Sequence, residues 1–370
     1  MKFTPEQLAQ LGQLLPMIAR TSENLAANMR PRSSVRMPAS TMLTPTGRNV
    51  QKLAFARGGF DNSALTERGI RGIFYDALEN QFDETWASAV GIMIPSDTLV
   101  EKHRWLGQTP GMREWVGGLL ARGLLDFEIQ IENKDFEATV EISTHDMELD
   151  KTGHVVLRIQ DLATRPNAHW EELLVALIEA NPTAYDSQAF FSASHSSGDS
   201  GTLSNLLTNA DLPALNVTTA TRPTREEASD ILVQAAAHMF SFKDDKGKKA
   251  NQGARSFLVV APPNMAPGFE QAISQSLYAT GGSNRLGGLG WQFDVVAEPE
   301  LSSTTVCYFH RVDAAASRPY ILQSLKEPTL DIIGMDSEHR KKNNSVIYSA
   351  KASRNVGPGE WRQALHLTLS

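Results

Sequence analysis

Cysteine is almost absent from this chain of 370 residues, and long apolar runs are absent altogether. The single cysteine, Cys307, excludes an internal disulfide and any multi-cysteine zinc site. It lies in the β-branched and aromatic run TTVCYFH, which predicts a small buried apolar side chain and not a thiol nucleophile. No run of about 18 apolar residues occurs, so no membrane-spanning helix is expected. Glu6 and several glutamines interrupt the N-terminal segment, which argues against a secretory signal and makes a reducing cytoplasm the expected setting.

A positive net charge is also missing. The chain carries 42 acidic residues against 35 lysines and arginines, which gives a net charge of −7. A protein whose main task is to grip nucleic acid needs a basic face, so that class is disfavoured. A protein that only encloses DNA remains compatible, because an acidic wall does not adhere to packed DNA.

Motifs for metals, cofactors and nucleophilic catalysis are weak. The nine histidines form no HExxH pattern, so no metal is predicted. The glycine-rich run 281–290 lacks a Lys-Ser/Thr ending and precedes a strand, which favours a flexible loop over a phosphate cradle, and no cofactor is implied. Residues 198–201 read GDSG, with His195 five residues before Ser200 in a Ser/Gly-rich loop. Such a loop is expected to leave both groups solvated, so a hydrolase using Ser200 is kept only as a remote alternative.

The sequence predicts five helices. They cover residues 4–30, 65–82, 153–180, 224–243 and 265–279. Pro16 and Pro166 predict a kink or bend in the first and third helices. In the fourth, Thr224 and Glu227 form a capping box. The apolar stripe of the third helix is predicted to consist of Leu157, Ile159, Leu162, Trp170, Leu173, Leu174, Leu177 and Ile178.

Strand patterns are concentrated in the second half of the chain. SFLVVAP, WQFDVVAE and several runs between 304 and 369 predict short strands, so the class is α+β and not a βαβ series. The alternating run FEIQIENKDFEATVEIS predicts a hairpin that turns at residues 133–135. Residues 30–52, basic and rich in proline, are either a flexible linker or an extended arm. The basic segment 338–344 predicts a solvated turn between strands, with an intersubunit or DNA-facing contact as the alternative.

The segment RWLGQTPGMREWVGG places Trp105 and Trp115 among glycine, proline and charged residues. Two readings stay open from the residues alone. The two tryptophans are either core side chains or part of a protein–protein contact surface, where tryptophan and arginine are enriched.

Several long segments in fixed order resemble the Mu-like phage major head subunit family, the gpT family. They are WLGQTPGMREWVGG, NKDFEATVEISTHDMELDKTGHV, YDSQAFFSASH, FLVVAPPNMAPGFEQ and YSAKASRNVGPGEW. The resemblance covers roughly residues 68 to 366. The chain departs from the family in two places: residues 1–67 are unmatched, and SSGDSG follows FFSASH where relatives carry an acidic-His-Pro run, which puts any role carried over to His195 in doubt.

The resemblance implies the Hong Kong 97-like capsid fold, with parts that follow one another along the chain. Residues 1–67 would be an N-terminal extension, with a retained arm favoured over a fused scaffold or a cleaved segment. Residues 68–100 would complete the N-terminal arm, and 101–140 would be an extended-loop hairpin. Residues 141–204 and 301–370 would form the peripheral domain, which includes a spine helix over 150–180. Residues 205–300 would form the axial domain.

The resemblance also implies a function, which is that of a major capsid protein and not of an enzyme. Pentamers and hexamers of such a subunit close an icosahedral shell around double-stranded DNA, which is enclosed without sequence recognition. A scaffold protein, a maturation protease and a portal are the expected partners, assembly is expected in the bacterial host cytoplasm, and no membrane is involved. A host nanocompartment of the same fold, which holds protein cargo, is the alternative.

Intersubunit contacts are expected in the extended loop and in the C-terminal strands. The candidate residues are Trp105, Arg113, Glu114, Trp115, Lys134, Phe136 and Arg354. Some shells of this fold carry Lys–Asn cross-links, and Lys134 with Asn355 would be the pair to examine here. The family resembled is not known for this bond, and no activating carboxylate can be placed from the sequence.

Overall fold

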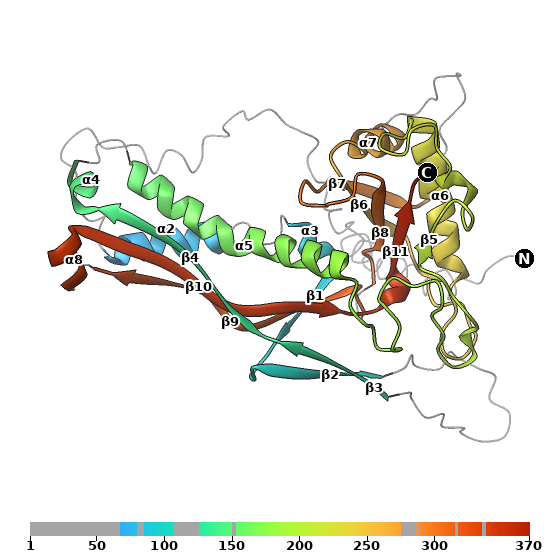
Figure 1. The fold of residues 1–370 in the computed structure, drawn as a ribbon, viewed down its shortest axis with the longest axis horizontal. Coiled ribbons are helices and arrows are strands. Elements are labelled where there is room, and N and C mark those ends of the chain that lie inside the picture. Colours follow the sequence, from blue (N-terminus) through green and yellow to red (C-terminus); the bar gives the residue numbers. More distant parts are fainter. Residues whose placement is uncertain are drawn as a thin grey trace, which may run out of the picture. The chain divides into compact units, whose positions relative to one another are not determined.

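Two β-sheets, each covered by helices, dominate the part of the chain that the computed structural model describes (Figure 1). The described residues are 67–79, 85–106, 126–149, 153–274, 286, 289–314, 317–334 and 338–370. They mix helices and strands in one compact unit, Asp61–Ser370, which confirms the α+β class. The predicted helix over 4–30 and the segment 30–52 lie outside the described residues.

The first sheet has the strand order β1-β9-β10-β4. Its bounds are β1, Gly91–Pro95; β4, Lys134–Ser143; β9, Tyr320–Ile333; and β10, Ser345–Pro358. The two 14-residue strands β9 and β10 are antiparallel, and β4 pairs antiparallel with β10 from Ser345–Ser143 to Arg354–Lys134. Strand β1 runs parallel to β9. A helix covers one face of this sheet.

That helix is α5, His154–Ala180, which packs on β10 and β4 and also contacts α2, Glu67–Glu79. It confirms the helix predicted over 153–180, and it runs as one helix through Pro166. Most of the predicted apolar stripe is buried, but Leu157 is 57% exposed. The buried part of the stripe contributes to two cores. Ile159 and Leu162 pack with the sheet and with Ile70 and Phe74 of α2, whereas Trp170, Leu174 and Ile178 share a core with α3, β9 and β10.

A two-stranded ribbon adjoins the first sheet. Strand β2, Val100–Leu106, pairs antiparallel with β3, Asp126–Glu132. The hairpin predicted to turn at residues 133–135 is therefore wrong, because β3 pairs with β2 while the next strand, β4, pairs with β10. Asn133 marks the passage from ribbon to sheet: its side-chain amide donates to Ser96 Oγ at 3.0 Å and to the Thr98 carbonyl at 2.9 Å.

The second sheet has the strand order β5-β11-β8-β6-β7. Its bounds are β5, Leu206–Leu207; β6, Ser256–Ala261; β7, Gln292–Ala297; β8, Val306–Arg311; and β11, Ala364–Thr368. Helices α6, Arg225–Ser241, and α7, Ala266–Ser274, pack against each other beside it, and their apolar residues share one core with its strands. Thr224 caps α6, and the predicted capping box with Glu227 is confirmed.

Short elements lie between the longer helices and strands. They are α3, Trp86–Val90; α4, Thr144–Leu149; α8, Glu338–Asn343; and three 3₁₀ turns, η4, Gly198–Ser200, η5, Pro213–Leu215, and η7, Trp361–Gln363. The turn predicted over 338–344 is instead the helix α8, supported by a Lys342–Glu338 pair one turn apart. No helix in the described part is long and apolar enough to cross a membrane.

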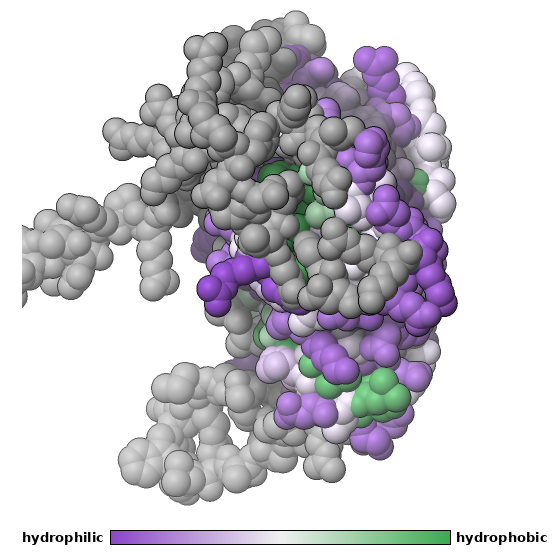
Figure 2. All heavy atoms as spheres, turned by 90° about the vertical axis from the view of Figure 1, so that its left-hand side faces the viewer, coloured by the Kyte–Doolittle hydropathy of each residue, from purple (hydrophilic) through white to green (hydrophobic). Residues whose placement is uncertain are grey.

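Strands β8 and β11, from the C-terminal segment 301–370, lie in the same sheet as β6 and β7, from the segment 205–300. The boundaries proposed for an axial and a peripheral domain stay a prediction. On the molecular face shown in Figure 2, hydrophilic side chains cover most of the described surface.

Candidate functional site

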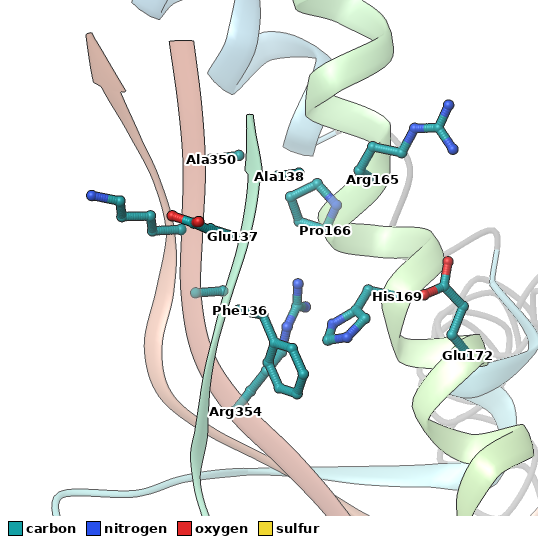
Figure 3. A pocket seen from close by; sticks show the side chains of 11 residues that line it. Phe136, Glu137, Ala138, Arg165, Pro166, His169, Glu172, Ala350 and Arg354 are labelled. Atoms are coloured by element: carbon teal, nitrogen blue, oxygen red, sulfur yellow. The ribbon is translucent and has the colours of Figure 1, made fainter. Parts of the chain in front are cut away.

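A cavity of about 220 Å³ lies between α5 and strands β4 and β10 (Figure 3). Alternation along the strands turns Phe136 and Ala138 of β4, and Ala350, Ala352 and Arg354 of β10, toward the helix. Because three of these five side chains are alanines, they leave a space that larger residues would fill.

The opposite wall of the cavity comes from α5. Arg165, His169 and Glu172 lie four and three residues apart, so they share one face of the helix. Pro166 adds an apolar patch between them, and Arg165 also pairs with Asp161 on the solvent side at 3.4 Å. The cavity therefore has an apolar floor and charged groups at its walls.

Arg354 is the most unusual group in this cavity. The residue is 3% exposed, and its guanidinium lies over the ring of Trp170, 4.6 Å from the ring centroid. Among the described residues no hydrogen-bond acceptor or carboxylate pairs with it, and its Nε atom is buried without a partner. Burial lowers the pKa of Arg354 to about 10, although the charges of Glu327 and Glu172 act in the opposite direction. The side chain therefore stays charged at neutral pH.

His169 lies beside Phe136, with 4.2 Å between the ring centroids and 64° between the ring planes. Its Nδ1 atom is buried, and no described residue bonds to it. Burial, with a smaller effect from the Arg354 charge, lowers the pKa of His169 to about 4. The imidazole is therefore neutral at pH 7, and it has one N–H to donate.

The chemistry of this arrangement is that of a binding site. A fixed cation and a neutral imidazole face a partly apolar space, which suits an anion of the size of a carboxylate. The exposed Glu172 carboxylate on the same wall acts against such an anion by its charge. The side chains that line the cavity include no hydroxyl or thiol, so they offer no nucleophile of the serine or cysteine type.

The structure brings together two of the predicted contact residues, Phe136 and Arg354, in this cavity. Lys134 is the first residue of β4; it is exposed and lies opposite Arg354 in the strand register. The backbone of Trp105 lies in β2 opposite Phe127. The other candidates, Arg113, Glu114 and Trp115, lie outside the described residues.

Sequence reasoning missed the three polar residues that α5 contributes to the cavity beside Pro166. Their signal is the spacing of Arg165, His169 and Glu172, which marks a polar stripe beside the apolar one. For the proposed cross-link pair, the Asn355 amide donates to the Glu132 carbonyl at 2.6 Å. The cross-link itself stays a prediction.

The prediction that His195 is solvated is wrong, because its side chain is fully buried. Nδ1 lies 2.6 Å from Asp186 Oδ2, and Nε2 lies 3.1 Å from Asn205 Oδ1. The imidazole stacks on Trp361 with 3.9 Å between centroids and an angle of 6°. His195 thus links loop 181–205 to the C-terminal segment. The Ser/Gly-rich composition of the loop does not predict this contact with Trp361.

The GDSG segment is also structural. Ser200 is buried, and its Oγ accepts from the Ser197 backbone at 2.9 Å and donates to the Gly201 carbonyl at 2.9 Å. Since both ring nitrogens of His195 bond to other groups, His195 does not act as a base on this hydroxyl. His195 and Ser200 therefore do not form the nucleophile–base pair that a serine hydrolase requires.

The C-terminal GPGEW motif is placed in the core. Glu360 accepts from Tyr185 Oη at 2.9 Å and from Arg362 Nη1 at 3.0 Å, and Arg362 also bonds to Tyr185. The Arg362 guanidinium lies over Trp361, 4.5 Å from the ring centroid. At Gly359 a Cβ atom would lie 2.6 Å from the Arg318 carbonyl oxygen, so only glycine fits. The motif is thus explained by packing.

Comparisons with known proteins agree with the motifs. Residues 64–225 match the family model described as Mu-like prophage major head subunit gpT, which confirms the resemblance over that range; the GPGEW motif lies beyond it. The chain is 32% identical over 108 residues to the major capsid protein of Escherichia phage Mu, which is 29% of this chain and 35% of that protein. It is 30% identical over 111 residues to the Mu-like prophage FluMu major head subunit of Haemophilus influenzae, 30% of this chain and 36% of that protein.

These alignments span about a third of the length of each relative. Among solved structures, the procapsid of bacteriophage JBD30 is similar with a TM-score of 0.47 and 22% identity, over 83% of this chain and 75% of that one.

Proposed function

We propose that this chain, whose residues 64–225 match the Mu-like major head subunit family, is the major capsid protein of a tailed phage or prophage with the Hong Kong 97-like fold. The family match over this range is the observation that carries the proposal. In this function the subunit forms pentamers and hexamers that close an icosahedral shell around double-stranded DNA. The role is structural, as it is for the relatives named as capsid proteins, and no enzymatic activity is expected.

The ribbon β2–β3 supports a role in assembly. An isolated two-stranded ribbon has marginal stability. Of the described side chains of this ribbon, only Ile129 and Ile131 of β3 are buried in a hydrophobic core. The connection between its strands, residues 107–125, contains Arg113, Glu114 and Trp115. Placed on a neighbouring subunit, these residues would bury apolar and charged groups in an obligate interface.

The net negative charge of the chain supports a shell that encloses DNA without adhering to it. A weak contact repeated at every subunit closes a shell by symmetry and avidity. A scaffold protein, a maturation protease and a portal belong to the same proposal, as does assembly in the host cytoplasm.

Electron micrographs of the full chain, expressed in bacteria and purified, test the proposal. We expect closed shells, or rings of five and six subunits. Shells that package a protein cargo and exclude double-stranded DNA would instead favour the nanocompartment. A protein that stays monomeric even when co-expressed with its scaffold and protease would refute both functions.

A further inference from the structure

We propose that the cavity between α5 and strands β4 and β10 is a carboxylate-binding site that receives an Asp or Glu side chain from a second copy of this chain. This inference rests on the proposed function, because a shell places copies of the chain against one another. Beyond that function, it specifies the chemistry of one contact between subunits, an ion pair in which Arg354 is the cation.

The unpaired charge of Arg354 is the first observation. A buried guanidinium is normally matched by a carboxylate or by carbonyl oxygens, because the loss of hydration is otherwise uncompensated. Within the described residues, Arg354 has a ring contact with Trp170 but no hydrogen bond and no ion pair. Glu327 and Glu172 act on it only through their charge. The guanidinium therefore faces a cavity that has room for an anion supplied from elsewhere.

The walls of the cavity fit such an anion. In Figure 3 the Arg354 side chain points into the space between β4 and α5, with His169 facing it across the cavity. Phe136 and Pro166 offer apolar contact for the methylene groups of an acidic side chain. The volume of about 220 Å³ corresponds to roughly seven waters of liquid. That space holds one carboxylate side chain, but not a large ligand.

A second copy of the chain is the source that the observations favour. Strand β4 is an edge strand of the described sheet, so a neighbouring subunit can approach next to the cavity. The chain has more carboxylates than cations, which makes an acidic group on a neighbouring copy the abundant complement. Bidentate pairing of arginine with a carboxylate also gives the fixed geometry that a repeated contact requires.

Arg354→Met tests the site, with two readouts. Methionine keeps much of the side-chain volume but removes the charge. If the anion comes from another copy, the substitution should not lower the stability of isolated subunits, since it replaces an unpaired buried charge by an apolar group. Their unfolding midpoint, measured below the concentration at which the parent assembles, should be equal to or higher than that of the parent. The concentration required for assembly should rise about tenfold or more.

Two further variants sharpen the experiment. Arg158→Met, on an exposed position of α5, is the matched control and should assemble like the parent. Arg354→Lys keeps the charge without the two-pronged geometry, and it should fall between the parent and Arg354→Met.

Three outcomes separate the explanations. If the parent assembles and Arg354→Met assembles at the same concentration, the carboxylate site is refuted and the capsid function stands. If isolated Arg354→Met subunits unfold more easily than the parent, Arg354 is paired within its own chain and the inference is equally wrong. A parent that forms no assemblies at all refutes the proposed function itself.

Discussion

Cys307 lies fully buried in β8, where burial raises the pKa of its thiol to about 12. A thiol reacts through its thiolate form, so both burial and the raised pKa protect it. We expect iodoacetamide at pH 8 to leave the native protein unlabelled and to add one group after denaturation, as measured by intact mass. Rapid labelling of the native protein would contradict the placement of this strand in the core.

Glu227 stabilises the start of α6. Burial opposes its charge, but hydrogen bonds from Thr224 and Thr218 outweigh this effect and lower its pKa to about 2. A folded pKa below the unfolded value of about 4.3 means that the stabilisation is full above that pH and is lost as the pH falls toward 2.

Glu227→Gln should therefore lower the free energy of unfolding by about 1 kcal/mol at pH 7. The difference from the parent should shrink as the pH is lowered from about 5 to about 2. Denaturant unfolding at several pH values measures this effect, with Asp230→Asn, exposed on the same helix, as the control. A pH-independent difference would show that the carboxylate charge is not the cause.

At the level of an element, the sequence predicted helix α5 correctly but was wrong about the burial of one residue in its apolar stripe. Leu174 is fully buried in the core beside the first sheet, whereas Leu157 is 57% exposed although the same stripe predicted both. We expect Leu174→Ala to lower the unfolding free energy by about 2–5 kcal/mol. Leu157→Ala should change it by less than about 0.5 kcal/mol. Equal losses in chemical denaturation would mean that the helix packs in a different rotation.

Local signals predicted the elements well. The capping box at Thr224, the run SFLVVAP and the helix over 153–180 each depend on residues close in sequence, and each is found in the structure. Strand pairing depends on distant residues. The alternation around Asn133 predicted two strands correctly, but not that β4 would pair with β10 about 200 positions later in the chain.

The candidate site was predictable only in part for the same reason. Phe136 and Arg354 lie in segments far apart in the sequence, and neither segment alone predicts that both side chains face α5. Their meeting depends on the register that sets Ala352 opposite Phe136. Likewise, His195 is buried because Asp186 and Trp361 reach it from other segments, so the composition of its own loop was misleading.

At the level of the whole molecule, assembly and folding are expected to respond to different residues. Trp115 belongs to the connection between β2 and β3, and tryptophan is a frequent anchor of protein interfaces. Trp115→Ala should raise the concentration required for assembly about tenfold or more, with the unfolding midpoint of isolated subunits unchanged. Gln108→Ala, in the same connection, is the control. A lowered midpoint for Trp115→Ala would instead make this tryptophan a core residue.

The particle mass of the purified full chain, measured by light scattering over a range of concentrations, tests the capsid function most directly. We predict masses of five or six times the 40.6 kDa subunit, or the far larger mass of closed shells, with a threshold concentration for assembly. A constant mass of 40.6 kDa at all concentrations, also after co-expression with the scaffold and protease, would contradict the assignment of this chain as a shell subunit.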